Sequence, residues 1–553
     1  MKNVSMRAFC VLFSATLAVA ANPLPDGAFP GTVQIDQAGN VYVAGVLNDH
    51  TFVAKLSPDA SQIVYMTTIA GSKADRAAAL ALGADGSAYI TGFTTSPDFP
   101  ATAGSLQPTA GNPQQAFAAK LDPQGKIQYA TYIGGSAFTT GNGIAVDASG
   151  SAYITGTISG GAAGFPVTPG SVSGYQGKPG AANNTAFIVK LDPAGSNALI
   201  SMVGFGGSHI ALDNAGNIIA VGAVTGTLTT TPGAFQENVP NTVCGTNFLL
   251  GSFPCSHQHV SRIDPTGARL IFATYVTGYY GATPAGVGID PDGNIVLAGV
   301  TNSPDYPGTL RAYQPQYLFY PSESFAPLAN FSPPVDSGYV TKLDPSGGAL
   351  VWSTFFSGSG TQATFNTYVD GDEITSMALD PKGNVWISGN AKSPDLPGLW
   401  NIPVVSRPAP PAMAGISMST AGFITRLTSD GVKISPTQLL PVPGAGAFNY
   451  PIALRGDGSA IEASYFTNVN LSDPPRVASI ADTDNTRLVR RARAASDFVG
   501  NETLSTAGFA AVRRIPGVVQ RNHGDLQRNR RPHPVCVGRP GQSASPVRDF
   551  GTE

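Results

Sequence analysis

The chain has 553 residues, more than the roughly 250 to 300 that one hydrophobic core accommodates, so it must contain several domains or an array of repeats. Its 65 Gly and 45 Pro residues, with only 12% charged residues, indicate a turn-rich all-β chain and exclude a disordered or mainly helical one. Segment 21–486 holds 18 basic and 30 acidic residues, and this acidic balance argues against nucleic acid or an anionic membrane as the partner.

The N-terminus has the pattern of a secretory signal peptide over residues 1–20. Lys2 and Arg7 precede the apolar run Ala8–Val19, and Ala18-Val19-Ala20 is a small-x-small cleavage site. The alternative of an uncleaved anchor is weaker, because a spanning helix needs about 20 apolar residues. We therefore expect a secreted or periplasmic protein, with attachment to the cell surface as a further option, and no transmembrane segment.

Seven places carry one short pattern, in which a turn ending in Gly and then Asn or Ser separates two apolar stretches. Asp at the start of such a turn accepts backbone hydrogen bonds, and Gly supplies the positive φ, so each copy predicts a β-hairpin. Gly83 and Arg455 replace this Asp in two copies, which predicts two less well capped turns. The seven turns are Asp36–Asn40, Gly83–Ser87, Asp147–Ser151, Asp213–Asn217, Asp290–Asn294, Asp380–Asn384 and Arg455–Ser459.

A second unit lies between these hairpins and occurs six times. It has an aromatic residue or His, a basic residue three positions later, and a turn such as Asp122-Pro123-Gln124-Gly125, followed by another strand. Two hairpins make a four-stranded sheet, which must stack on its neighbours to bury both faces, so we predict a β-propeller of four-stranded blades. Seven Gly-turn copies favour seven blades, and six copies of the second unit keep six as the alternative.

These motifs match a known repeat. The run Phe117 to Gly125, with Tyr129 to Ser136, Ile144 to Gly150 and Ser96 to Pro100, resembles the SBBP type of bacterial β-propeller repeat. The resemblance covers about residues 30–460. It implies the propeller fold but no activity, because the family has no general assigned activity.

Cysteine and histidine offer few chemical sites. Cys10 belongs to the signal peptide, whereas Cys244 and Cys255 close a short loop that an oxidising compartment would join by a disulfide; two unpaired thiols are the alternative. His257 and His259 alternate along a strand and would point to one face, as metal ligands do. His259 nevertheless occupies the position of Phe52 and Phe117 in other copies, so packing within a blade is the better interpretation.

Two groups of charged residues are candidates for binding. The six basic residues of the second unit could ring the channel and bind anions, although recurrence in every copy favours a structural ion pair or hydrogen bond to the neighbouring blade. They are Lys55, Lys120, Lys190, Arg262, Lys342 and Arg426. Asp370, Asp372 and Glu373 form the densest carboxylate cluster and are weak candidates for a Ca²⁺ site. Asp75 stands at the repeat position of Asp372, so a plain turn is favoured, and no other cofactor is expected.

Insertions of variable length follow the Gly-turn hairpin in several copies. The segments 244–255, 311–334 and 401–419 should emerge on the same side of the disc, because the connection recurs once per blade. They carry aromatic residues that could stack on sugars or peptides, although they could instead only cover blade edges. These ligand-face candidates are Tyr313, Tyr317, Phe319, Tyr320, Phe325 and Trp400.

The repeats end near Pro475, which places the propeller domain at residues 21–475. The tail 476–553 is Arg-rich and free of Lys, and we expect it to be disordered or translated out of frame. No sequence motif for catalysis is present in a fitting context. We therefore expect a monomeric binding or scaffold module for an extracellular glycan, peptide or protein. An extracellular lyase or hydrolase with its site at the channel mouth is one alternative, and a calcium-stabilised adhesion module is another.

Overall fold

The structure is a computed structural model that describes residues 23–162, 164–174, 185–225, 228–239, 243–247, 251–317, 336–358, 361–362, 369–393, 395–399, 421–440, 449–463, 467–469 and 471. The predicted signal peptide, 1–20, and the predicted tail, 476–553, lie outside the described residues. So do Phe319, Tyr320, Phe325 and Trp400.

Six antiparallel sheets have four strands, each sheet from one run of the chain. The first three blades contain β1 (Ala28–Ile35), β2 (Val41–Leu47), β3 (His50–Leu56) and β4 (Ile63–Ile69); β5 (Asp75–Leu82), β6 (Ala88–Thr94), β7 (Gln115–Leu121) and β8 (Ile127–Ile133); and β9 (Phe138–Val146), β10 (Ala152–Ser159), β11 (Thr185–Leu191) and β12 (Ala198–Val203). The next three contain β13 (His209–Leu212), β14 (Ile218–Val224), β17 (His257–Ile263) and β18 (Leu270–Tyr275); β19 (Ala282–Ile289), β20 (Ile295–Thr301), β21 (Ser337–Leu343) and β22 (Leu350–Phe356); and β25 (Glu373–Leu379), β26 (Val385–Ala391), β27 (Ala421–Leu427) and β28 (Gln438–Leu440).

Three smaller sheets complete the described strands. The three-stranded sheet contains β29 (Ile452–Leu454), β30 (Ala460–Glu462) and β31 (Thr467–Val469). Two hairpins lie in insertions, β15 (Val243–Asn247) with β16 (Gly251–Pro254) and β23 (Thr361–Gln362) with β24 (Val369–Asp370).

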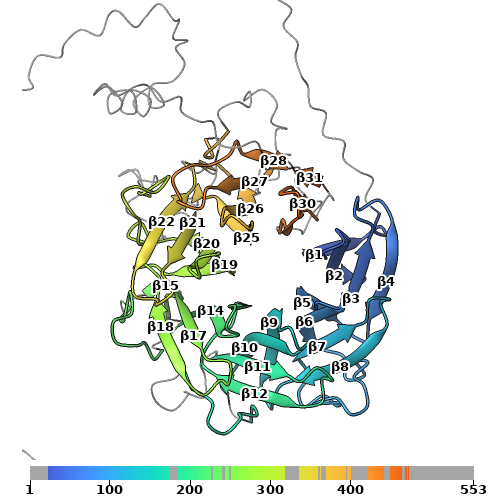
Figure 1. Ribbon diagram of the computed structural model, residues 1–553. Helices are drawn as coiled ribbons and strands as arrows, with labels where there is room; N and C mark the ends of the chain where they lie inside the picture. The colour runs from blue at the N-terminus through green and yellow to red at the C-terminus, as the bar shows by residue number, and fades with distance from the viewer. Residues whose placement is uncertain are drawn as a thin grey trace, which may run out of the picture. The chain divides into compact units, whose positions relative to one another are not determined.

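The four-stranded sheets are the blades of a propeller. The first strand of each lies near the centre of the ring and the last at the rim (Figure 1). Each first strand contacts the first strand of the next blade, and β29 contacts both β25 and β1. The prediction of an all-β propeller of four-stranded blades is confirmed. Six blades of four strands favour the six-blade alternative over seven, because the seventh Gly turn lies in the three-stranded sheet.

The Gly turns have the predicted geometry. Asp36 accepts hydrogen bonds from the backbone and side-chain amides of Asn40, both at 2.8 Å, and Gly39 has φ of 86°. The turns at Gly83 and Arg455 are less well capped, as expected, because their carboxylates each accept one backbone amide, whereas Asp213, Asp290 and Asp380 each accept two. Asp85 accepts the Ser87 amide at 2.9 Å, and the second turn uses Asp457 in the same way. An Asp two positions later therefore replaces the missing one only in part.

Neighbouring blades interlock through the turn between their third and fourth strands. Gly125 has φ of 83°, and a Cβ atom there would lie 2.5 Å from the ring of Tyr65 in the preceding blade. Gly431 lies in the same way on Trp352. Only Gly fits, because the turn needs positive φ and the backbone rests directly on an aromatic ring.

A short segment that begins with a tight turn, here called the strap, covers the outer strand of the second to fifth blades. Its first Thr donates a backbone hydrogen bond to the outer strand, as from Thr102 to the Ala130 carbonyl at 2.8 Å. In the second blade Tyr132 returns one to the Gln107 carbonyl at 3.0 Å. The straps are Thr102–Gln107, Thr168–Ser173, Thr231–Gln236 and Thr309–Gln314, and of the three insertions named in the sequence analysis 311–334 alone overlaps one of them.

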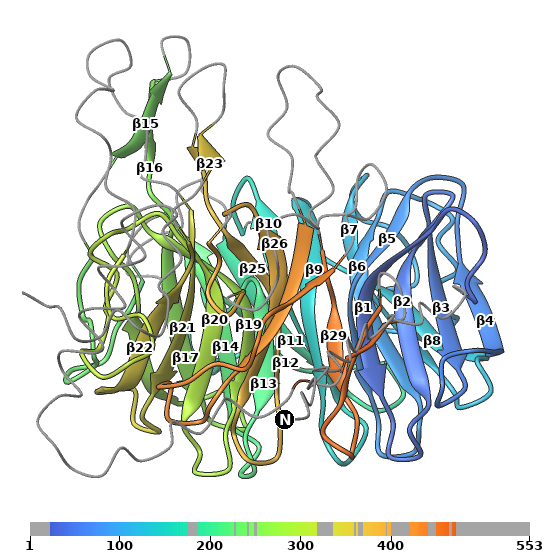
Figure 2. The same cartoon turned by 90° about the horizontal axis from the view of Figure 1, so that it is seen from above.

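The two faces of the ring differ. The connections after β14, β20 and β26 leave the same face, and Figure 2 shows β15, β16 and β23 raised above it. We call this the insertion face. The opposite face, which carries the Gly turns, is called the turn face.

Candidate functional site

The loops between blades on the insertion face are held by the Ser-Pro-Asp motif. Asp98 accepts the backbone amide of Ser72 at 2.8 Å, where Ser72 lies in the loop from the first blade to the second. Asp305 accepts the amide of Tyr279 at 3.0 Å at the corresponding place between the fourth and fifth blades. The motif therefore fixes the loops that lead into the inner strands.

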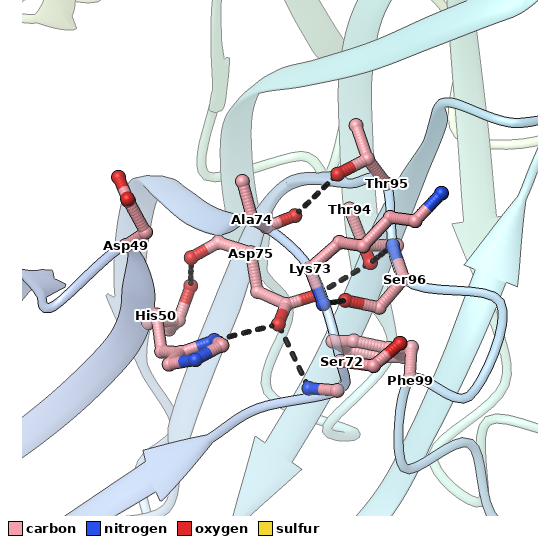
Figure 3. A network of polar contacts seen from close by, with 12 residues as sticks. Asp49, His50, Ser72, Lys73, Ala74, Asp75, Thr94, Thr95, Ser96 and Phe99 are labelled. Carbon is pink, nitrogen blue, oxygen red and sulfur yellow. Dashed lines mark hydrogen bonds and ion pairs between the residues drawn. The ribbon is translucent and has the colours of Figure 1, made fainter.

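A His–Asp pair lies at the boundary of the first and second blades on this face. Asn48 and Asp49 form a two-residue turn with φ of 52° and 66°, which places His50 at the start of β3. Its Nδ1 lies 3.1 Å from Oδ2 of Asp75, the first residue of β5 (Figure 3). Asp75 is fully buried, whereas the His50 side chain is 30% exposed.

The Asp75 carboxylate is also bound by the protein on its other sides. It accepts the Gly71 amide at 2.8 Å and the Thr94 hydroxyl at 2.5 Å. An imidazole held by a buried carboxylate has the arrangement that orients a general base. In the same network, the Ser72 hydroxyl donates a hydrogen bond to Asp98, and the Ser96 hydroxyl accepts one from the Lys73 amide.

Comparison with the equivalent positions in other blades shows that the His50–Asp75 pair also has a structural role. By strand register, Gln115 and His257 occupy the position of His50 at the start of their strands. Gln115 donates to the Gly135 carbonyl at 3.3 Å, and Nδ1 of His257 lies 3.2 Å from the Thr277 hydroxyl. In these blades a polar residue at this position links the blade to the segment that follows it, whereas the sixth blade has Ala421 here. The sequence patterns missed His50, although the two-residue turn before it and the repeat register could have singled it out.

The two carboxylates of the proposed Ca²⁺ cluster whose side chains are described, Asp372 and Glu373, are bound by different groups of the protein. Asp372 is fully buried and accepts bonds from the amides of Gly358, Lys392 and Ser393 and from the Ser393 hydroxyl. Glu373 binds the Lys392 ammonium at 3.0 Å. The side chain of Asp370 lies outside the described residues. Asp372 thus caps loops as Asp75 does, and within the described part of the chain no three His, Cys, Asp or Glu side chains are grouped so that they could hold a metal ion.

A second carboxyl lies beside Glu373 at the boundary of the fifth and sixth blades. Burial, together with the charge of Glu373, raises the pKa of Asp336. Asn302 donates a hydrogen bond to this carboxyl and opposes the shift. The equivalent contact between the first and second blades is an ion pair, Asp49 with Arg76 at 2.7 Å.

Four of the six recurring basic residues form ion pairs on the turn face, inside their own blades. Lys342 lies 2.9 Å from Asp290, with side chains only 5% and 2% exposed. Burial opposes the ionised form of Asp290, but the Lys342 and Asn294 hydrogen bonds lower its pKa. Lys342 also donates to the Ser429 carbonyl of the next blade at 2.7 Å. These contacts fit the structural interpretation, with the correction that the ion pair itself does not cross to the neighbour.

Corresponding contacts exist in other blades. Lys55 lies 3.5 Å from Asp36, Lys190 lies 3.3 Å from Asp147, and Arg262 pairs with Asp213. The remaining two basic residues, Lys120 and Arg426, lie over the rings of Tyr89 and Trp386.

His257 and His259 are both buried in the fourth blade. Neither ring nitrogen of His259 has a hydrogen-bond partner among the described residues, and burial lowers its pKa to about 4. His259 thus packs as Phe does in other copies, against Gly222.

Some of the cysteine and aromatic candidates lie within the described residues. Val243 pairs with Pro254 in the β15–β16 hairpin, which brings the chain near Cys244 and Cys255 together, but the Cys244 side chain is outside the description and the disulfide stays a prediction. Of the ligand-face candidates, Tyr313 and Tyr317 lie within the described residues, and their role in binding stays a prediction. Tyr317 is 7% exposed and packs edge-on to Phe355, and Tyr313 packs on the fifth and sixth blades. Their rings fill the strap region.

Two hollows lie on the turn face. One of about 910 Å³ lies between the fifth and sixth blades and is lined by Asp290, Lys342, Trp352 and Lys382. Another of about 600 Å³ is lined by the first three Gly turns. A smaller one of about 280 Å³ on the insertion face is lined by Gln236, Thr277 and Asp305.

Residues 128–161 match the family model described as the SBBP beta-propeller repeat. The chain contains an SBBP propeller repeat. This confirms the resemblance seen in the sequence, and the matched segment runs from β8 through β10. No helix among the described residues is long and apolar enough to cross a membrane.

Comparison with solved structures found distant neighbours. Kuenenia stuttgartiensis hydrazine synthase is 12% identical over 82% of this chain and 97% of that chain, with a TM-score of 0.40. A streptogramin B lyase is 11% identical with the same coverage and a TM-score of 0.39. Synechocystis apocarotenoid oxygenase is 13% identical over 76% of this chain and 72% of that chain, with a TM-score of 0.32. A comparison with curated proteins found no match.

Proposed function

We propose that this chain is an exported binding module whose SBBP propeller presents a ligand site on the insertion face. The observation that carries the proposal is the contrast between the faces. The turn face consists of short turns whose polar groups are bound by the protein itself, as at Asp36. The insertion face carries every long connection that follows a second strand, and such variable loops on a rigid scaffold are where binding sites gather.

The ligand class follows from export and from the loop composition. An extracellular glycan, peptide or protein fits a site assembled from Pro-rich and aromatic insertions. The acidic balance of segment 21–486 makes a polyanion a poor partner.

The test compares the two faces. The exported chain is screened against glycan and protein arrays, together with a variant in which residues 318–335 are replaced by a short Gly-Ser linker. Lys382→Ala on the turn face is the control, because Lys382 is exposed there. We expect the insertion variant to lose at least tenfold in affinity and the control to bind as the unchanged chain does. Equal binding by the insertion variant, or equal loss in both, contradicts the proposal.

The His–Asp pair favours one second candidate, an extracellular enzyme. Gln115 at the equivalent position shows that Gln can make the interblade bond, so His50→Gln should keep the fold and remove proton transfer. If a lyase or hydrolase substrate is found in the same screen, His50→Gln should abolish its turnover without changing the melting temperature. Unchanged turnover rejects this candidate.

A further inference from the structure

Among the described residues, no strap covers the outer strand of the first blade, β4, in the way that straps cover the outer strands of the next four blades. The two-residue turn between β2 and β3 leaves no chain to form one. The effect on burial is direct. Tyr65, Met66 and Thr67 are half-buried and Thr68 is exposed, whereas their counterparts Tyr129 to Tyr132 in β8 are all buried.

The backbone groups that bind a strap are present in β4. By register, Met66 corresponds to Ala130, whose carbonyl accepts the strap Thr, and Thr68 corresponds to Tyr132, whose amide donates to the strap Gln. No strap hydrogen bond reaches Met66 or Thr68 within the described ranges. β4 therefore presents a paired donor and acceptor at the rim of the ring (Figure 1).

The side chain of Thr67 completes the arrangement. In the strapped blades the equivalent hydroxyls of Thr131, Thr274 and Thr354 accept the amide of the strap Gln at 2.8 to 3.0 Å. Thr67 donates its hydroxyl to the Gly125 carbonyl at 2.6 Å and keeps its oxygen as an acceptor. The second blade has a strap, and there the corresponding carbonyl of the next blade, that of Gly195, accepts the amide of Leu106 from the strap at 2.8 Å.

β4 also lacks the features that protect an open edge. Its sequence, IVYMTTI, contains no charge, Pro or Gly, and Val64 is 58% exposed. Natural edge strands usually carry such features, because an unprotected edge pairs with other strands. The straps show which peptide fits this one: each begins with Thr and a tight turn, and three of the four end in a large apolar or aromatic residue followed by Gln.

We propose that β4 binds a turn-containing segment of a partner protein in the way that a strap binds its blade, with the pattern exemplified by Thr231–Gln236. Thr of the segment donates to the Met66 carbonyl, its last carbonyl accepts the Thr68 amide, and its Gln amide donates to the Thr67 hydroxyl. Main-chain bonds of this kind give affinity while side chains give specificity. The site lies on the rim, so it is independent of the site proposed on the insertion face.

The experiment uses the exported full chain and a fluorescent peptide with the sequence of residues 229–236, followed by anisotropy. We expect saturable one-to-one binding, with no binding of a scrambled peptide of the same composition. Thr68→Pro should weaken binding at least tenfold, because it removes the donor amide at an edge that tolerates Pro. Val64→Lys should also weaken it, whereas Leu199→Lys should not, since Leu199 occupies the same position in the strapped β12 and is similarly exposed.

Melting temperatures of the variants show that each is folded. Equal binding of the scrambled peptide, or equal effects of Val64→Lys and Leu199→Lys, overturns the proposal. Binding that appears only after truncation beyond Pro475 overturns the choice of partner, because the tail of the chain then occupies the edge. A dimer that Val64→Lys dissociates overturns it in favour of a second copy.

Discussion

The turn face and the insertion face are built from the same repeats but are constrained in different ways. On the turn face, every copy reuses one turn, in which Asp or its substitute binds the amide of Asn or Ser, and in five blades the third-strand cation packs over an aromatic ring. On the insertion face, equivalent positions hold different residues, such as His50, Gln115 and Ser337. This difference indicates that the repeated contacts of the turn face stabilise the fold, whereas the residues of the insertion face can differ between blades and so can bind a ligand.

The sharpest way to break this comparison is Gly125→Ala. The new Cβ would press on the Tyr65 ring in a backbone region that Ala adopts with strain, so we expect a loss of about 3 kcal/mol in unfolding free energy. Gly104→Ala in a strap is the matched control, because its φ is 81° but no atom lies within 4 Å, and it should cost about 1 kcal/mol. Urea unfolding measures both. Equal losses would show that blade interlock on the turn face matters little.

Two ion pairs of the turn face differ in burial, and their loss should therefore destabilise the protein to different extents. Lys342→Met leaves Asp290 buried without its cation and should cost about 3 kcal/mol. Lys55→Met should cost about 1 kcal/mol, because its pair with Asp36 is longer and the side chains are 15% and 16% exposed. Urea unfolding at low and high salt is the measurement. A larger loss for Lys55→Met would contradict the burial argument.

His259, which occupies the aromatic position of the fourth blade, makes the stability of that blade depend on pH. Because the folded-state pKa of His259 is lowered to about 4 from its usual 6.5, the unfolded chain takes up its proton first, and stability is lost as pH falls from 6.5 toward 4. We expect His259→Phe to remove about 2 kcal/mol of the loss between pH 7 and pH 5. His209, with its pKa also lowered to about 4 by burial, should keep its own share. Unfolding at the two pH values tests this, and an unchanged pH dependence would refute it.

The smallest expected effects are those of metal removal and of reduction. Because Asp372 is bound by three amides and a hydroxyl, a chelator should leave the melting temperature unchanged, and a shift would favour the calcium-stabilised alternative. If Cys244 and Cys255 are joined as predicted, non-reducing mass spectrometry will show no alkylatable thiol at either position. Reduction should then loosen the β15–β16 hairpin and change the melting of the ring little.

Most of the blade architecture followed from the sequence, because it rests on local patterns. The Asp turns and alternating strands such as Tyr129–Tyr132 each identify themselves within a few residues. The straps were missed because segments such as Thr102–Gln107 have no alternation and are held by hydrogen bonds to residues far along the chain. The His50–Asp75 pair and the bare edge of β4 were missed because each depends on register between strands far apart in the chain. The blade count depended on where the last repeat loses its fourth strand.

The central claim, that ligand binds the insertion face and not the turn face, is tested most directly by hydrogen exchange of the exported chain with and without a binder from the array screen. We predict new protection in the segments 240–256, 302–336 and 392–420. No change is expected in the turns Asp36–Asn40, Asp290–Asn294 and Asp380–Asn384, whose amides are already bonded to Asp. New protection confined to those turns and to the hollow between the fifth and sixth blades would contradict the account.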